Sequence, residues 1–281
     1  MMPWRPMPEF ADMDPATLRH ALELVRRHTG IGMGPAKKSM LQSRLRRRMR
    51  ALRLDSYEDY LRRLEQDEGE RQPFIDTVTT HHTTFFRTPR VWQYVREQFL
   101  PPWIERHGGA TLRAWSAASS SGEEACSIAI CCEELRRRHP ALNYEISATD
   151  IAGDVLEQAR AGAYAGNSVQ AFRAAHPQLF DHYNCLGSDE RFMLAPPVRE
   201  RIGFSLHNLL EPSPWRDRFD LIFLRNVLIY FKADAIETIV RNIAPALRDD
   251  GILIIGEAES LAAKNVPFTF VRPQIYRRTS L

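Results

Sequence analysis

From about residue 110 onward, short β-rich runs alternate with longer helical stretches. The β-rich runs predict strands at Ala110–Trp115, Tyr144–Ala148, Ile202–Leu206, Asp220–Leu224 and Ile252–Ile255. Apolar residues at helical spacing predict helices at Glu123–Arg138, Asp154–Ala161 and Ala233–Leu247. Because parallel strands need a crossover between them, this alternation predicts an α/β fold with a doubly wound, mostly parallel sheet covered on both faces.

Three stretches depart from this alternation. Residues 162–200 predict an inserted helical subdomain, and residues 89–109 predict a connecting segment. In the tail, Phe268–Val271 and Ile275–Tyr276 predict an antiparallel edge to the sheet. We therefore expect the sheet domain to span residues 110–281.

The first 85 or so residues show helical periodicity only. Asp14 followed by Pro15 predicts the start of a helix, and Gly30 predicts its end. Pro35 opens a second helix, and two more follow. The apolar face of the second helix comprises Leu41, Leu45, Met49 and Leu52. This pattern predicts a small all-α domain over residues 1–88.

The second helix lies in a basic block that contains no acidic residue. Its members are Lys37, Lys38, Arg44, Arg46, Arg47, Arg48, Arg50 and Arg53. Arg46, Arg50 and Arg53 share the side that faces away from the apolar stripe. Three interpretations stay open at this point: a solvated basic face, a docking surface for an acidic partner, and attraction to nucleic acid.

Composition excludes several classes of protein. The chain has 281 residues, of which 44% are hydrophobic and 26% charged, as in ordinary globular domains. No apolar run reaches the ~20 residues that span a bilayer, and the N-terminus lacks the apolar core of a signal peptide. No C-x-x-C pair occurs among Cys126, Cys131, Cys132 and Cys185. We expect a cytoplasmic protein with free thiols and no membrane insertion.

Polar side chains follow the predicted central strands. Asp150 ends the second strand, Asn208 follows the third, and Arg225 and Asn226 follow the fourth. Ligands of doubly wound sheets bind at the carboxyl ends of the strands, where an acidic residue commonly binds ribose hydroxyls. The pattern predicts a nucleoside-type ligand, although Asp150 on its own is equally compatible with a helix N-cap.

The loop after the first strand, Ser116–Glu124, is rich in small residues but holds a single glycine. A G-x-G-x-x-G motif is therefore absent. Glu123 and Glu124 lie at a helix start, which disfavours a bound pyrophosphate and favours a cationic or hydroxyl-bearing ligand.

The stretch from Thr79 to Arg87 contains the pair His81 and His82 beside several threonines. No third ligand follows at helical spacing, so we expect no metal site. The alternative is a polar connection between domains, anchored by Phe85 and Phe86.

Five motifs occur in an order that resembles the CheR family of chemotaxis receptor methyltransferases. They are T-T-x-x-T-x-F-F-R (Thr79 to Arg87), W-S-A-A-S-S-S-G-E-E (Trp115 to Glu124), A-T-D-I (Ala148 to Ile151), N-L-L-E (Asn208 to Glu211) and F-L-R-N-V-L-I-Y-F (Phe223 to Phe231). The resemblance covers nearly the whole chain, and the N-terminal helices fit that family's small basic domain.

The resemblance implies a class I methyltransferase domain that binds S-adenosyl-L-methionine, releases S-adenosyl-L-homocysteine and needs no metal. Position by position, it implies cofactor contacts by His81, Thr83, Arg87, Glu124, Asp150, Asn208, Leu209, Arg225 and Asn226. It also implies catalytic roles for Arg87 and Tyr230, which we expect to position the acceptor.

The activity that the resemblance implies is methylation of glutamate carboxylates on the cytoplasmic helical bundle of chemoreceptors. A glutamate carboxylate, with a pKa of about 4.3, is already ionised at neutral pH, so the reaction needs no general base. Arg46, Arg50 and Arg53 would dock the acidic receptor helices. We expect a monomer without a nucleic-acid partner.

The chain departs from the family's pattern at three places. His81 replaces a usual asparagine, and Ala125-Cys126 replaces a usual Pro-Tyr. The segment from Asn184 to Arg201 holds the single Gly187, whereas many relatives use a glycine-rich turn there to bind a pentapeptide tether of the receptor. We expect this protein to act without that tether.

Two alternative functions stay open. One is a methyltransferase for RNA or another protein, although an N-P-P-Y-like motif is absent. The other is a catalytically weak adapter that senses S-adenosylmethionine and docks on receptors, an alternative that His81 keeps open.

Overall fold

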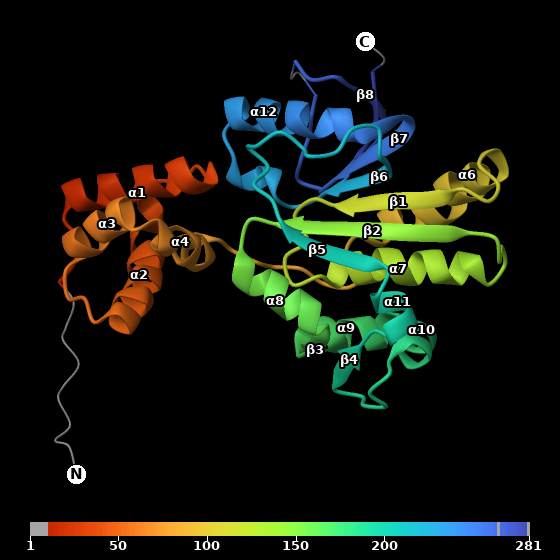
Figure 1. Ribbon diagram of the computed structural model, residues 1–281, viewed down its shortest axis with the longest axis horizontal. Coiled ribbons are helices and arrows are strands. Elements are labelled where there is room, and N and C mark those ends of the chain that lie inside the picture. Colours follow the sequence, from red (N-terminus) through yellow and green to blue (C-terminus); the bar gives the residue numbers. More distant parts are fainter. Residues whose placement is uncertain (1–10, 263–264, 280–281) are drawn as a thin grey trace. The chain divides into compact units, whose positions relative to one another are not determined.

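The computed structural model describes residues 11–262 and 265–279, and the chain forms two compact units (Figure 1). One unit ends at Thr80 and the other begins at His81. Residues 81–88, expected in the helical domain, fall in the second unit. The reason is that the Phe85 ring packs against the rings of Tyr164, Phe172 and Phe192 there.

The first unit is all-α, as predicted. Its elements are α1 (Pro15–Thr29), η1 (Pro35–Lys37), α2 (Lys38–Leu52), α3 (Tyr57–Gln66), η2 (Glu68–Glu70) and α4 (Arg71–Val78). The Asp14 side chain accepts the first backbone N–H groups of α1, and Gly30 ends that helix with φ 73°. The fully buried core includes Leu24, Leu41, Leu45, Met49, Tyr60 and Phe74.

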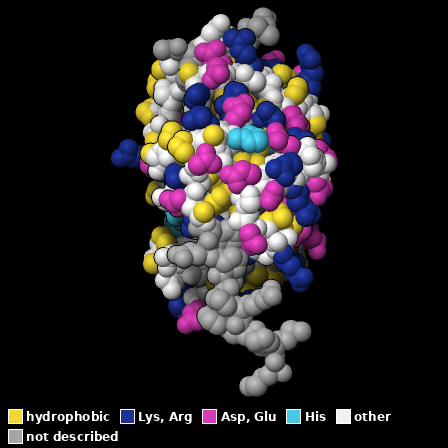
Figure 2. Space-filling model, turned by 90° about the vertical axis from the view of Figure 1, so that its left-hand side faces the viewer, with side chains coloured by type: hydrophobic (Ala, Val, Ile, Leu, Met, Phe, Trp, Pro, Cys, Tyr) yellow, Lys and Arg dark blue, Asp and Glu magenta, His cyan; other side chains and the backbone are white. Residues whose placement is uncertain are grey.

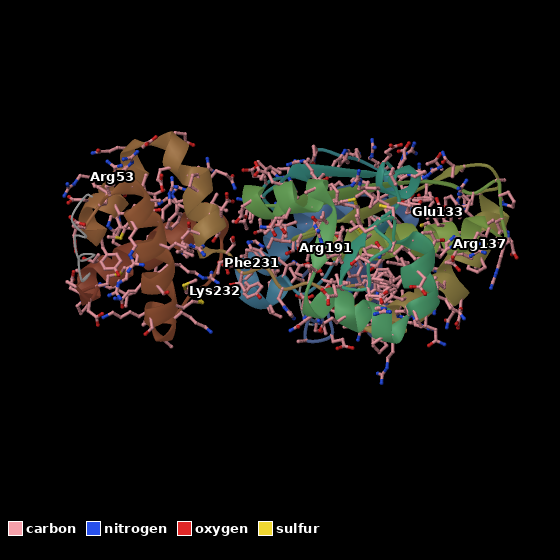
Figure 3. All side chains as sticks on the ribbon, turned by 90° about the horizontal axis from the view of Figure 1, so that it is seen from below. Arg53, Glu133, Arg137, Arg191, Phe231 and Lys232 are labelled. Carbon is pink, nitrogen blue, oxygen red and sulfur yellow. The ribbon has the colours of Figure 1, made fainter. Side chains whose placement is uncertain are left out.

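Part of the basic block serves the fold of this unit. Arg48 donates from Nε and Nη2 to the two carboxylate oxygens of buried Glu70, at 2.7 and 2.6 Å. Arg46 donates from Nε to the Tyr57 hydroxyl at 2.7 Å. Arg53, the residue after α2, is exposed (Figure 3). The block is therefore not a uniform solvated face.

Seven strands form the main sheet of the second unit, in the order β5-β2-β1-β6-β7-β9-β8. They are β1 (Thr111–Ser116), β2 (Asn143–Asp150), β5 (Ile202–Leu206), β6 (Phe219–Leu224), β7 (Leu247–Ile255), β8 (Phe268–Arg272) and β9 (Ile275–Arg278). The first five strands of that order are parallel, and β9 and β8 are antiparallel. The predicted doubly wound sheet and its antiparallel tail are confirmed.

Both faces of the sheet are buried under helices (Figure 1). The covering elements include α5 (Pro89–Tyr94), the π-helix η3 (Val95–Phe99), α6 (Leu100–Arg106), α7 (Glu123–Arg136), α8 (Gly153–Ala161) and α12 (Ala233–Ile243). Along β6, Leu221 and Phe223 join the core shared with α7, whereas Ile222 and Leu224 join the core shared with α12. This alternation is what a strand buried on both faces requires.

The predicted helix over Ala233–Leu247 is too long. Helix α12 ends at Ile243, the 3-10 turn η5 covers Ala244–Ala246, and β7 begins at Leu247. Pro245 cannot donate a backbone hydrogen bond within a helix, and Leu247 pairs with Phe219 of β6 instead. The polar residues after Leu247 hid the start of this strand from the apolar pattern.

The inserted subdomain contains β structure as well as helices. Strands β3 (Ala163–Ala165) and β4 (Arg191–Met193) pair antiparallel, and the helices are α9 (Asn167–Ala175), α10 (Pro177–Tyr183) and α11 (Pro196–Arg199). Strands of three residues are too short to produce a recognisable alternation, so the sequence indicated helices alone.

Candidate active site

The carboxyl ends of β1, β2 and β6 form the edge of the sheet where a ligand is expected. Strand β1 lies between β2 and β6, and the winding of the chain reverses between β1 and β6. Ligands of open α/β sheets bind at such a switch point. Here the edge carries Ser116, Asp150 and Arg225, each at or directly after the end of its strand.

The loop between β1 and α7 has a backbone shaped for close approach. Ser120 and Gly122 have φ values of 50° and 95°. A Cβ on Gly122 would lie 2.9 Å from the Tyr164 hydroxyl and 3.1 Å from the Ala159 Cβ, so only glycine fits without displacement. This local geometry places the backbone N–H of Ser120 against Asp150.

Asp150 is 7% exposed, and backbone N–H groups hold its carboxylate. Ser120 donates to Oδ2 at 2.8 Å and Ala152 donates to Oδ1 at 3.0 Å. Burial raises the pKa of the Asp150 carboxyl, and the charge of nearby His81 opposes that increase. A carboxylate has about four acceptor positions, so Asp150 can still accept from a ligand hydroxyl beside the backbone donors of Ser120, Ile151 and Ala152.

A buried ion pair joins Glu124 at the start of α7 to Arg225 after β6. Arg225 Nη1 lies 2.9 Å from Glu124 Oε2, and the two side chains are 1% and 11% exposed. The Ser116 hydroxyl donates to Glu124 Oε1 at 2.7 Å, and Arg225 Nη2 donates to the backbone carbonyl of Arg87 at 2.8 Å. The last of these contacts connects Arg87, which belongs to the second unit, to the sheet edge.

Several buried polar atoms around this edge have no hydrogen-bond partner among the residues that the structure describes. They are Ser119 Oγ, Ser120 Oγ, His207 Nε2 and Arg225 Nε. Buried polar groups are nearly always paired, so such a concentration indicates a polar ligand. S-adenosylmethionine carries ribose hydroxyls, an ammonium group, a carboxylate and a sulfonium cation, and these groups match the available donors, acceptors and carboxylates.

Sequence reasoning missed Glu259, which lies shortly after the end of β7. Its carboxylate accepts backbone N–H groups from Asn226 at 3.0 Å, Leu228 at 2.7 Å and Gly256 at 2.5 Å. Asn226 has φ 58°, so this loop needs external support. The sequence does carry a signal for Glu259, because a polar residue shortly after a strand end also marks Asp150 and Arg225.

The structure shows fewer contacts for the remaining predicted site residues. Asn208 Oδ1 accepts the backbone N–H of Leu210 at 3.0 Å, and Leu209 is buried. Arg87 Nη1 donates to the carbonyl of His82 at 3.0 Å. Thr83 and Tyr230 are half-buried.

Two kinds of feature are absent from residues 11–262 and 265–279. No helix there is long and apolar enough to cross a membrane. No group of three or more His, Cys, Asp or Glu side chains there could hold a metal ion.

The strand order and this edge define the second unit as a class I methyltransferase-type domain. A family model described as "CheR methyltransferase, SAM binding domain" matches residues 81–277, and one described as "CheR methyltransferase, all-alpha domain" matches residues 16–79. The chain therefore belongs to the CheR methyltransferase family.

Curated relatives agree with this assignment. The chain is similar to a chemotaxis protein methyltransferase of Salmonella typhimurium, 36% identical over 258 residues, covering 88% of this chain and 84% of the relative. It is similar to chemotaxis protein methyltransferase 1 of Pseudomonas aeruginosa, 32% identical over 242 residues, covering 85% and 87%. A chemotaxis protein methyltransferase of Escherichia coli is 32% identical over 280 residues, covering 96% and 93%. The protein is thus a methyltransferase of chemotaxis with an S-adenosylmethionine-binding domain.

Proposed function

We propose that this protein transfers a methyl group from S-adenosylmethionine to glutamate side chains of chemoreceptor cytoplasmic domains, which gives glutamate methyl esters and S-adenosylhomocysteine. The observation that carries the proposal is the sheet edge at which Asp150, the Glu124–Arg225 pair and unpaired buried hydroxyls converge. Membership of the CheR methyltransferase family supports the choice of acceptor.

Each polar group of the edge has a role in this proposal. Asp150 binds the ribose hydroxyls, and Asn208 and Leu209 border the adenine. Glu124, fixed by Arg225 and Ser116, faces the methionine moiety together with His81, Thr83 and Asn226. The bound cofactor supplies an electrophilic methyl group on a sulfonium sulfur.

The acceptor chemistry places few demands on the protein. A glutamate with a pKa of about 4.3 is a carboxylate at neutral pH and needs no proton removed before it attacks. The protein must orient one carboxylate oxygen in line with the methyl group and exclude water. Arg87 and Tyr230 orient the acceptor in this proposal, so Arg87→Ala should abolish transfer.

The helical unit supplies the partner surface. Arg46, Arg50 and Arg53 on and beside α2 attract the acidic methylation helices of the receptor, and the protein acts as a cytoplasmic monomer. The inserted subdomain has only two three-residue strands, which supports a mode of action that does not need the receptor's pentapeptide tether.

The test is methyl transfer from radiolabelled S-adenosylmethionine to a purified receptor signalling domain, read out as base-labile methanol. Labelled methanol with wild type and none with Arg87→Ala is the expected result. Binding of S-adenosylhomocysteine without any methyl transfer would favour the alternative function, a catalytically weak adapter that senses the cofactor. Label on RNA and none on the receptor would mean that RNA is the methyl acceptor.

A further inference from the structure

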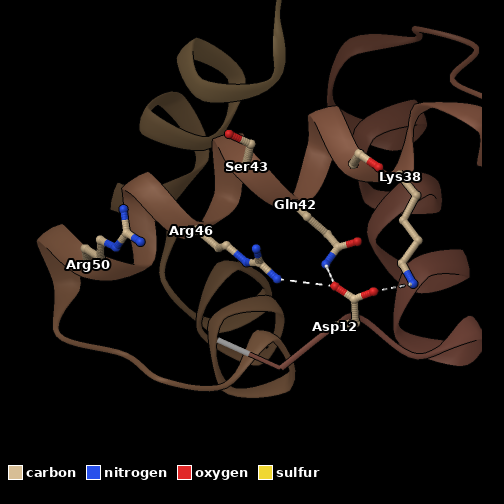
Figure 4. A pocket seen from close by; sticks show the side chains of 7 residues that line it. Asp12, Lys38, Gln42, Ser43, Arg46 and Arg50 are labelled. Carbon is tan, nitrogen blue, oxygen red and sulfur yellow. Dashed lines mark hydrogen bonds and ion pairs between the residues drawn. The ribbon is translucent and has the colours of Figure 1, made fainter. Parts of the chain in front are cut away.

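A pocket of about 340 Å³ lies along α2, and Asp12 is one of its lining residues (Figure 4). Its lining residues are Asp12, Lys38, Ser39, Gln42, Ser43, Arg46 and Arg50. Asp12 Oδ1 accepts from Gln42 Nε2 at 3.0 Å and from Arg46 Nη2 at 3.4 Å. Asp12 Oδ2 lies 3.7 Å from Lys38 Nζ. One carboxylate therefore meets three donors from one helix.

The donors are built into the helix, whereas the carboxylate is peripheral. Gln42 is 4% exposed, and Arg46 is held by the Tyr57 hydroxyl through its Nε. The Asp12 side chain, by contrast, is 80% exposed. The hydrogen bond from Gln42 and the charge of Lys38 lower the pKa of Asp12, so it is ionised at neutral pH. The site thus holds an anionic carboxylate that water can reach.

The donors form a regular row. Lys38, Gln42, Arg46 and Arg50 follow one another at intervals of four residues, which places them along one ridge of α2. A partner helix with carboxylates at the same interval matches this row in spacing and in charge. Figure 2 shows basic and acidic side chains interspersed on the face that it presents.

We propose that Lys38, Gln42 and Arg46 form a carboxylate-binding subsite which Asp12 occupies in the free protein and leaves when a glutamate of an acidic partner helix binds. Asp12 then acts as an internal competitor that weakens docking. The identity of the partner helix rests on the function proposed above; the subsite itself rests on the contacts of Asp12.

The first experiment compares Asp12→Asn with Asp55→Asn in the full-length protein. Asp55 is an exposed acid of the same unit outside the pocket, so both variants remove one negative charge. The probe is a fluorescein-labelled, alanine-based helical peptide with glutamate at every fourth position, and fluorescence anisotropy at low salt gives its affinity. Exposed charge pairs contribute little, so we expect roughly three- to fivefold tighter binding for Asp12→Asn alone. Equal affinities of the two variants would refute the proposal.

A second pair of variants tests the donors. Lys38→Ala should weaken peptide binding more than Arg47→Ala, because Arg47 is exposed on the same helix but does not line the pocket. The same peptide with glutamine in place of glutamate should bind no variant; binding equal to that of the glutamate peptide would also refute a carboxylate site.

Methyl transfer to the receptor domain, measured in parallel, separates this inference from the proposed function. Transfer by wild type together with no effect of Asp12→Asn on peptide affinity would reject the subsite alone. Tighter binding by Asp12→Asn together with no transfer by any variant would reject the enzyme assignment and keep the subsite.

Discussion

The sheet edge and the surface of α2 use the same kind of ion pair in opposite ways. At the edge, the Arg225 and Glu124 side chains are 1% and 11% exposed, and their pairing fixes the geometry of the site. On α2, the carboxylate of Asp12 is 80% exposed and can exchange for another. Burial raises the cost of separating two charges, so a buried pair organises a site and an exposed pair can act as a replaceable contact.

The largest effect should come from breaking the buried pair. Arg225→Met leaves the Glu124 carboxylate buried without its partner, and we expect the free energy of unfolding to fall by about 3–5 kcal/mol. Urea denaturation measures this value. Adding Glu124→Gln removes the stranded charge and should restore part of the loss. If Arg225→Met alone were as stable as wild type, the buried pair at the sheet edge would contribute no more than the exposed pair on α2.

A smaller loss should follow Glu259→Gln. The amide cannot accept all three backbone N–H groups that the carboxylate accepts, and we expect about 2 kcal/mol of lost stability together with slower methyl transfer. Glu257→Gln is the matched control, because Glu257 is exposed two residues away. Equal denaturation midpoints and equal transfer rates for both variants would show that Glu259 does not support the loop.

His81 should shift the pH range over which Asp150 loses its charge and cofactor binding weakens. Because the pKa of Asp150 is raised, its ionised form costs stability above that pKa, and this cost disappears as the pH falls through it. Affinity for S-adenosylhomocysteine should fall over the same range, because the ribose then loses its carboxylate partner. His81→Asn removes the charge that lowers the pKa of Asp150, so that pKa should rise further. Calorimetry at decreasing pH should then show the loss of affinity for S-adenosylhomocysteine beginning at a higher pH. An unchanged pH profile would mean that His81 does not influence Asp150.

The smallest effect should come from an exposed pair of the helical unit. Arg62 Nη1 lies 2.8 Å from Asp59 Oδ1, but the two side chains are 63% and 53% exposed. Arg62→Ala should change the free energy of unfolding by less than about 0.5 kcal/mol in the same urea assay. A loss as large as that of Arg225→Met would mean that burial does not decide the value of these pairs.

Features set by neighbouring residues were predictable from the sequence. Helix α1 begins after Asp14 and ends before Gly30, as expected, and the predicted strand Ile202–Leu206 is the observed β5. The strand-end rule predicted the place of Asp150 and Arg225 at the carboxyl edge of the sheet, because polar residues after apolar strands are recognisable in the sequence. The same rule missed Glu259, since Gly256, Glu257 and Ala258 separate it from the end of β7 and its role depends on the distant loop at Asn226 and Leu228.

What the sequence determined by itself is the α/β class, the helical first unit, the caps and the positions of most strands, because these depend on periodicity and on local hydrogen bonding. Only the tertiary structure decided which distant groups meet. Asp220 illustrates this: it is fully buried and accepts from Trp103 Nε1, Arg113 N and Arg248 Nη1, three donors that lie far from it in the chain. Likewise, the basic block carries one kind of charge, but packing pairs Arg48 with the buried Glu70 and places Lys38 and Arg46 beside the exposed Asp12. Charge type is written in the sequence, whereas burial, which sets the strength of each pair, arises only when the chain is packed.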